Sequence, residues 1–227
     1  MIKSFSIVTS IALLFLQGAE VKQLSEESSA SQILAVAQKM ISAVKEVDDI
    51  ISETEILYHK KGKENKRYRL TYFYKQNGLS RLNFSRPYPG VTVFYKRGDE
   101  KLTVKPFRFL PLRFSFSIYN SMFKSPSGQR IDQADVEYIV GFLYKNIKWI
   151  REKKSEFFEE ENRIKFMFWA RDYVENKNLE KYRVLVSKKN WLPIQIERYD
   201  LENKPIEIVI FKKYTIDPHL KDEFFLP

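Results

Sequence analysis

The feature that most constrains the fold is a strict alternation of side-chain character over residues 163–171. Every second position is apolar, and the apolar series is Ile164, Phe166, Phe168 and Ala170. The positions between them are Arg163, Lys165, Met167, Trp169 and Arg171. Successive side chains of a β-strand point to opposite faces, so this pattern predicts a strand with one buried face. The same alternation recurs over residues 182–187, 192–197 and 206–211.

The N-terminal half shows strand patterns in shorter segments. Asn77-Gly78 is the strongest hairpin signal in the chain, because these residues readily adopt the positive φ angles of a tight turn. Gly98-Asp99 indicates a further turn. The strands predicted in this half are residues 66–76, 79–86, 91–96, 101–105 and 107–118.

Two segments have the three- and four-residue spacing of amphipathic helices. The first spans about residues 25–51, and its apolar stripe consists of Ile33, Val36, Ala37, Met40, Ile41, Val44, Val47 and Ile51. The second follows Asp132, which can cap it, and its apolar face consists of Val136, Ile139, Val140, Leu143, Ile147 and Ile150. The charged residues 151–161 are predicted to be an exposed helix end and a loop.

These patterns together predict an α+β fold that is mainly antiparallel β. One apolar face of a long sheet must be covered, and two amphipathic helices are available to cover it. A strongly curved half-barrel sheet of about ten strands, with the two helices on its concave face, satisfies this requirement. The aromatic content fits, since 18 Phe, 13 Tyr and 3 Trp favour strands over a helical bundle.

The first residues have the pattern of an export signal. Lys3 gives a positive start, residues 5–16 are uncharged and mostly apolar, and the small Ala19 precedes the polar Glu20. The apolar run is shorter than the roughly 20 residues that a membrane-spanning helix needs. We therefore expect residues 1–19 to be a cleaved signal peptide, residues 20–227 to form a single domain, and the mature protein to be periplasmic. An uncleaved anchor or a buried N-terminal helix is the alternative.

Composition argues against most enzyme classes. The chain has no cysteine and only two histidines, His59 and His219, which excludes thiolate chemistry and leaves little for a metal site or a catalytic triad. We therefore expect no catalytic residues, no metal and no cofactor. The net charge of +10 favours anionic partners, such as anionic lipid head groups, cell-wall polymers or acidic envelope proteins.

The C-terminal strands carry a resemblance to a known family. Residues 184–200 and 204–214 read as a strand, a Leu192-Pro193 start to the next strand, an acidic turn and a final strand, followed by Ile216-Asp217-Pro218 and Phe224-Phe225. This order resembles the LolA-like superfamily, which includes the periplasmic outer-membrane lipoprotein carrier and lipoprotein-sorting-like relatives. The Pro89-Gly90, Pro106-Phe107 and Pro111-Leu112 stretches look closer to an uncharacterised exported branch of it.

The resemblance implies a half-barrel whose concave apolar face holds acyl chains beneath a helical lid. The family's carrier has an Arg-Pro step at the end of an early strand, and that Arg helps to hold the lid. Residues 75–78 read Lys-Gln-Asn-Gly at the corresponding place, so the lid-holding Arg is absent here.

The residues expected to line an acyl-chain cavity lie on the alternating strand faces. They are Tyr72, Tyr74, Phe84, Phe166, Phe168, Ile194 and Ile196. The alternative is that these side chains pack against the helices and leave no cavity. Basic residues are candidates for a rim that meets phosphate head groups: Arg69, Arg81 and Arg86, with Arg67 and Lys105 beside them. Their alternative role is a solvated outer strand face.

Three classes of function fit these features. The first is an exported carrier that reversibly buries the acyl chains of a lipid or lipoprotein. The second is a non-transporting envelope binding or sensor module on the same scaffold, which recognises a protein or lipid partner. The third is an oligonucleotide-binding protein that uses residues 66–74 for stacking and charge. The export signal argues against nucleic acid as the partner.

Overall fold

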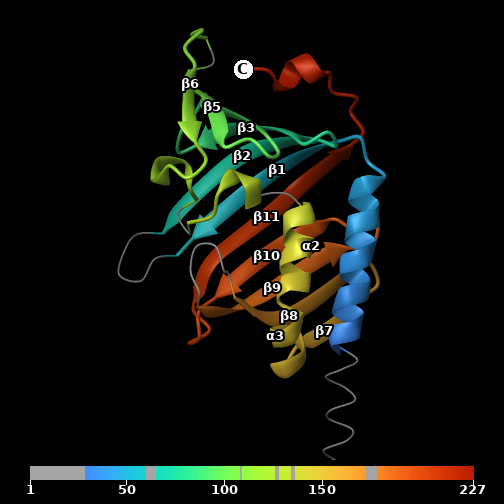
Figure 1. Cartoon of the computed structure of the whole chain (residues 1–227). Helices are drawn as coiled ribbons and strands as arrows, with labels where there is room; N and C mark the ends of the chain where they lie inside the picture. Colours follow the sequence, from blue (N-terminus) through green and yellow to red (C-terminus); the bar gives the residue numbers. More distant parts are fainter. Residues whose placement is uncertain (1–28, 60–64, 108, 126–127, 134–135, 172–177) are drawn as a thin grey trace, which may run out of the picture.

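The computed structural model describes residues 29–59, 65–107, 109–125, 128–133, 136–171 and 178–227; the predicted signal peptide lies outside these ranges. Within them, eleven strands form one open antiparallel sheet in the order β6-β5-β4-β3-β2-β1-β11-β10-β9-β8-β7 (Figure 1). The strands are β1 Asp49–Tyr58, β2 Lys66–Lys75, β3 Leu79–Arg86, β4 Thr92–Lys96, β5 Lys101–Lys105, β6 Phe114–Ser117, β7 Glu156–Glu159, β8 Arg163–Arg171, β9 Leu179–Ser187, β10 Pro193–Tyr199 and β11 Pro205–Ile216.

The sheet consists of two meanders that meet at its centre. β1 to β6 run outward on one side, and β7 to β11 run inward on the other, each strand pairing with its neighbour in sequence. β1 pairs with β2 on one edge and with β11 on the other, so the first and last strands join the two meanders. The predicted fold class, a curved mainly antiparallel α+β half-barrel, is confirmed.

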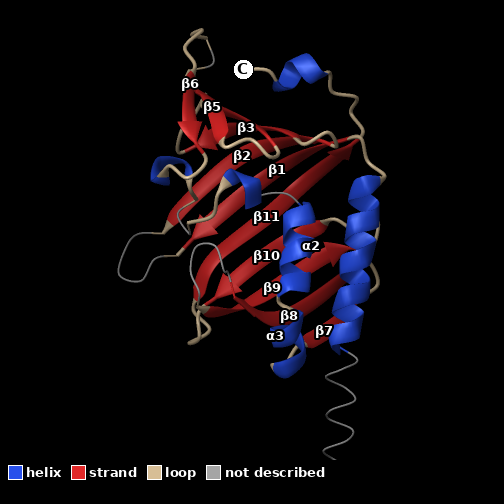
Figure 2. Ribbon diagram, viewed as in Figure 1, coloured by secondary structure: helices blue, strands red, loops and turns tan. Residues whose placement is uncertain are grey.

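Three helices lie on the same face of the sheet (Figure 2). The N-terminal helix is described over residues 29–45, and it is followed later in the chain by α2 Val136–Lys145 and α3 Ile147–Glu152. Short 3-10 turns occur at η1 Ser121–Phe123, η2 Ile131–Gln133 and η3 Asp222–Phe225. No described helix is long and apolar enough to cross a membrane.

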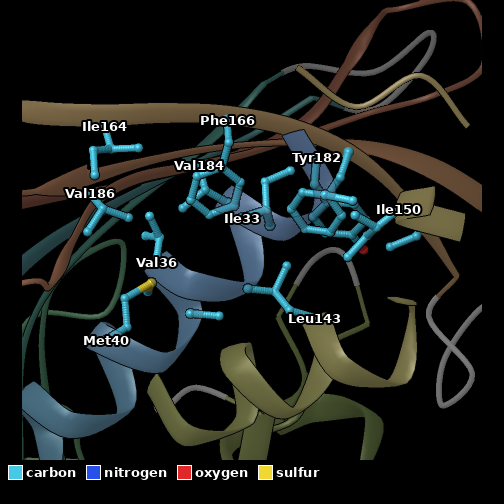
Figure 3. Close-up of a cluster of buried hydrophobic side chains, with 14 residues drawn as sticks. Ile33, Val36, Met40, Leu143, Ile150, Ile164, Phe166, Tyr182, Val184 and Val186 are labelled. Atoms are coloured by element: carbon cyan, nitrogen blue, oxygen red, sulfur yellow. The ribbon is translucent and has the colours of Figure 1, made fainter. Parts of the chain in front are cut away.

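The main core lies between the helices and the strands β8 and β9. Ile33 and Met40 of the N-terminal helix are fully buried and point toward the sheet, where Phe166 is also fully buried (Figure 3). Leu143 of α2 joins the same cluster. The even-numbered residues of β8 are buried, as the alternation predicts, so this part of the sheet is covered by helix.

The first predicted helix is too long at its C-terminal end. The described helix ends at residue 45, and Ile51, which was assigned to its stripe, lies in β1. The β-branched pair Ile50-Ile51 favours a strand, and Ile50 packs with Tyr74 of β2 in a separate core cluster. The strand β1 was not predicted from the sequence, although it is the strand that joins the two meanders.

The regions around the second helix also differ from expectation. Asn146 divides the predicted single helix into α2 and α3, and Asp132 lies in η2, where it forms an ion pair with Arg130. Within the charged residues 151–161, Glu156–Glu159 forms the edge strand β7, because it pairs with β8. Of the predicted strand 107–118, only Phe114–Ser117 pairs, since prolines before it cannot donate to a ladder.

Candidate ligand-binding cavity

A cavity of about 160 Å³ lies between the central strands and α2. Strands from both meanders contribute to it, together with η2, α2 and the segment before η2. Most of its lining is apolar. The lining residues are Thr54, Ile56, Leu70, Tyr72, Leu82, Gln129, Gln133, Tyr138, Phe142, Phe168, Tyr182, Val184, Ile196, Arg198, Glu207, Val209 and Phe211.

The register of the sheet explains why these side chains meet. Ile196 of β10 is paired with Val184 of β9 on one side and with Val209 of β11 on the other. Val209 is in turn paired with Ile56 of β1. Directly paired residues of an antiparallel sheet project to the same face. A continuous apolar row therefore crosses four strands and forms the floor of the cavity.

Aromatic side chains of α2 cover one side of this floor. The Phe142 ring lies 5.1 Å from the Tyr182 ring of β9, measured between ring centroids, and Tyr138 stacks on Phe142 at 6.5 Å. The amide of Gln133 donates to the Tyr138 hydroxyl over 2.7 Å, so the polar end of that tyrosine is satisfied. The helix thus presents aromatic surface to the cavity.

One end of the cavity is polar and buried. The Arg198 guanidinium lies 3.0 Å from the Glu180 carboxylate and 3.6 Å from that of Glu207, and all three residues are buried. Burial alone would lower the pKa of Arg198, but the Tyr182 hydroxyl and the two carboxylates raise it overall, so the guanidinium stays charged. This ion-paired group fixes β9, β10 and β11 relative to one another.

Three of the seven expected lining residues face the cavity, namely Tyr72, Phe168 and Ile196. The Tyr72 hydroxyl shares a hydrogen bond of 3.2 Å with the Ser80 hydroxyl, and Tyr72 lines the cavity. Phe168 stacks against Tyr182 with 5.5 Å between ring centroids. These three come from β2, β8 and β10, so the cavity draws on both meanders.

The other four expected residues lie outside the lining. Phe166 packs beneath the N-terminal helix in the main core, Tyr74 is buried with Leu192 in a smaller cluster, and Phe84 packs against a cluster of β4 and β5 residues. Ile194 is half-buried at a register irregularity of β10. Phe166, Tyr74 and Phe84 therefore pack in the protein core and do not line a cavity, which is the alternative given for them above.

The expected rim arginines are not gathered at the cavity. Arg69 belongs to the opposite face of β2, where Glu55 binds it at 3.5 Å and Arg67 at 2.6 Å. Arg81 donates to the Phe224 carbonyl over 2.9 Å and stacks on the Phe224 ring, and therefore holds the C-terminal segment. Arg86 is exposed at the end of β3, paired in register with Arg69. Lys105, the last of this basic set, ends β5.

Several cavity residues were not foreseen. Glu207, Val209 and Phe211 form the cavity face of β11, whereas the isoleucines between them belong to its other face. Arg198 and Glu207 occupy directly paired positions in register, but that register comes from the fold and is not visible in the sequence. Phe142 was overlooked, since the apolar stripe of its helix could be drawn without it. Within the described residues, no three His, Asp or Glu residues could hold a metal ion.

Solved structures of similar fold are the known proteins that match this chain. No family model and no curated protein sequence matches the chain. A putative outer membrane lipoprotein-sorting protein domain from Vibrio parahaemolyticus is 15% identical, with 87% of this chain and 97% of that chain covered and a TM-score of 0.45. A LolA superfamily protein from Nitrosomonas europaea is 11% identical, with 84% of this chain and 97% of that chain covered and a TM-score of 0.39.

The lipoprotein LppX of Mycobacterium tuberculosis is 9% identical, with 84% of this chain and 98% of that chain covered and a TM-score of 0.47. These likenesses, at identities of 9–15%, concern the fold alone.

Proposed function

We propose that the protein is an exported periplasmic carrier that reversibly buries acyl chains of a lipid or lipoprotein in the cavity under α2. The observation that supports this most is an apolar row that lines the cavity instead of packing against a helix. The row consists of Val184, Ile196, Val209 and Ile56. Binding, rather than catalysis, is the function of such a site. No reacting group is needed.

The size of the cavity sets the scale of the interaction. An engineered apolar cavity of roughly 150 Å³ holds a benzene-sized molecule, so about 160 Å³ admits a segment of one chain. Each buried methylene contributes about 0.8 kcal/mol. Eight methylenes would therefore contribute roughly 6 kcal/mol, which corresponds to a Kd of roughly tens of micromolar.

Tighter binding requires more room, and α2 is the element that can provide it. It reaches the cavity through Tyr138 and Phe142, and the Phe142–Tyr182 ring contact is the part of this cover that a longer chain must displace. Phe142→Ala should therefore enlarge the cavity and strengthen uptake of long chains relative to short ones.

The test is uptake of a fluorescent fatty acid by purified protein. Val209→Trp fills the floor of the cavity, while Ile208→Trp adds the same bulk on the other face of β11. We expect Val209→Trp to weaken binding at least tenfold and Ile208→Trp to leave it nearly unchanged. Equal effects of both variants, or no uptake by the native chain, would refute the carrier function.

Native mass spectrometry of protein expressed with its leader and purified from the periplasm without detergent completes this test. A mass excess that resolves into phospholipid or acylated peptide supports the carrier and names the ligand class. A clean mass for residues 20–227 supports export, and favours the envelope binding or sensor module instead.

A further inference from the structure

The described residues of the connection between β5 and β6, together with the first residue of β6, carry an exposed apolar surface, the hairpin tip. It consists of Phe107, Phe109, Leu110, Leu112 and Phe114, with exposed fractions of 48%, 84%, 36%, 48% and 48%. These are five of the thirteen large apolar side chains that are exposed in the described part of the chain. Such clustering marks an interaction surface, whereas single exposed residues do not.

The hairpin tip extends beyond the rest of the sheet at the upper end of the view (Figure 1). Leu102 and Val104 of β5 are buried, but the apolar character continues past the end of this core into the loop. In the tip, the rings of Phe107 and Phe109 contact each other at 6.0 Å between centroids. An exposed apolar cluster of this kind marks a site of contact with a protein or a membrane.

The charge around the hairpin tip is of one sign. Residues 101–124 contain five Lys or Arg and no Asp or Glu, in a chain that has 29 acidic residues. Lys105 and Arg113 flank the loop directly, at the ends of β5 and β6. The acidic Asp99 and Glu100 precede the opposite end of β5. The tip therefore complements an anionic surface.

We propose that the hairpin tip docks the protein on the surface of an anionic phospholipid bilayer. Phe109 and its apolar neighbours enter the boundary between head groups and acyl chains, where the Phe and Leu side chains of interfacial segments are buried. Lys105 and Arg113 remain at the level of the lipid phosphates. Apolar insertion and electrostatic attraction each contribute a part of the affinity, and a shallow contact of this kind is reversible. This surface is separate from the cavity and does not depend on the proposed cargo.

The absence of cysteine from the chain allows a direct test. Phe109→Cys gives a single site for the environment-sensitive fluorophore NBD, and Leu201→Cys gives a matched site, 67% exposed, in the turn between β10 and β11 and flanked by acidic residues. With phosphatidylglycerol–phosphatidylethanolamine vesicles, we expect the NBD emission at position 109 to rise and shift to shorter wavelength. The label at position 201 should not respond, and phosphatidylcholine vesicles should have little effect on either.

Vesicle flotation of unlabelled protein measures the affinity. The double variant Phe109→Ser/Leu110→Ser should bind the anionic vesicles at least about tenfold more weakly, and Leu201→Ser should bind like the native chain. Added salt should weaken binding by screening the attraction. Because these side chains lie outside the core, both variants should keep the native circular dichroism.

Two outcomes would overturn the proposal. One is an unchanged NBD spectrum at position 109 in the presence of the anionic vesicles. The other is an NBD shift without lipid that accompanies a concentration-dependent increase in molar mass, because the hairpin tip would then be a contact between two copies of this chain.

Discussion

Asp49 and Asp217 bind each other's backbone where the first and last strands of the sheet meet. The Asp217 carboxylate accepts from the Asp49 amide over 3.4 Å and from the neighbouring Asp48 amide over 2.8 Å, and the Asp217 amide donates to the Asp49 carbonyl over 2.9 Å. The buried Asp49 carboxylate accepts from the His219 and Leu220 amides. Asp217 has a φ of 51°, a left-handed conformation that Asp tolerates better than most residues. The junction is therefore specified by two carboxylates.

Asp49→Ala should lower the free energy of unfolding by about 1–3 kcal/mol, because two backbone amides lose their acceptor. Asp99→Ala, in the exposed turn before β5, serves as the control and should change stability by less than about 0.5 kcal/mol. Urea denaturation followed by circular dichroism measures both. Equal stabilities of the two variants would contradict this role of Asp49.

Glu55 gives the stability a defined pH dependence. Its carboxylate is buried on the outer face, where a hydrogen bond from Lys212 and the charges of Arg67 and Arg69 lower its pKa below 4.5, although burial opposes this. A lowered pKa in the folded state stabilises the protein above the unfolded value, and this stabilisation is lost as pH falls through the folded pKa.

Glu55→Gln should therefore be less stable than the native chain at pH 7, and the difference should shrink as the pH is lowered below 4.5. The exposed Glu53, on the same strand, offers Glu53→Gln as the matched control, with little effect expected at pH 7. Unfolding curves at a series of pH values test this. A difference that persists unchanged into acid would mean that packing, not charge, is responsible.

Asn146 links the two helices after η2 to the sheet. Its side chain donates to the Phe142 carbonyl over 3.0 Å and accepts from the Arg171 amide over 2.7 Å, and it is fully buried. Asn146→Leu leaves that amide without a partner and should cost about 1–3 kcal/mol. Hydrogen exchange should accelerate at Arg171, and the exposed Asn162→Ala should alter neither quantity.

Arg198 is expected to be the most sensitive cavity residue. Arg198→Met removes the cation from between Glu180 and Glu207, and breaking a buried ion pair in this way costs about 3–5 kcal/mol. The variant leaves two buried carboxylates without their cation, and unfolding in urea followed by circular dichroism measures the loss. Adding Glu180→Gln should recover part of the stability; no recovery would argue against the pairing.

The sequence predicted best the strands with only one buried face. β8 alternates cleanly because its even-numbered residues meet the helices and its odd-numbered residues do not. β1 lies at the centre of the sheet, and Glu55 is buried on its outer face while Thr54 is buried on its inner face. Because several of its buried positions are polar, β1 shows no apolar alternation, so the joining strand was missed.

The cavity depended on information that a single strand does not carry. Tyr72, Phe168 and Ile196 share the alternation of Tyr74 and Phe166, but the positions of the helices decide which members are covered. The same holds for the rim, since Arg81 is held by Phe224, which is 143 residues away in the chain. The sequence pattern therefore shows which residues share a face of the sheet. Only the tertiary packing shows which of those residues line the cavity.

The pairing of β1 with β11 has a consequence for how the chain folds. Every other strand pairs only with a neighbour in sequence, so either meander can form from local contacts. The β1–β11 ladder is the long-range step, and closing a loop of that length before any contact is made slows folding. While the chain is being synthesised, β1 leaves an edge open until β11 has emerged. An unfinished chain therefore carries an unpaired strand edge until its last strand has been made.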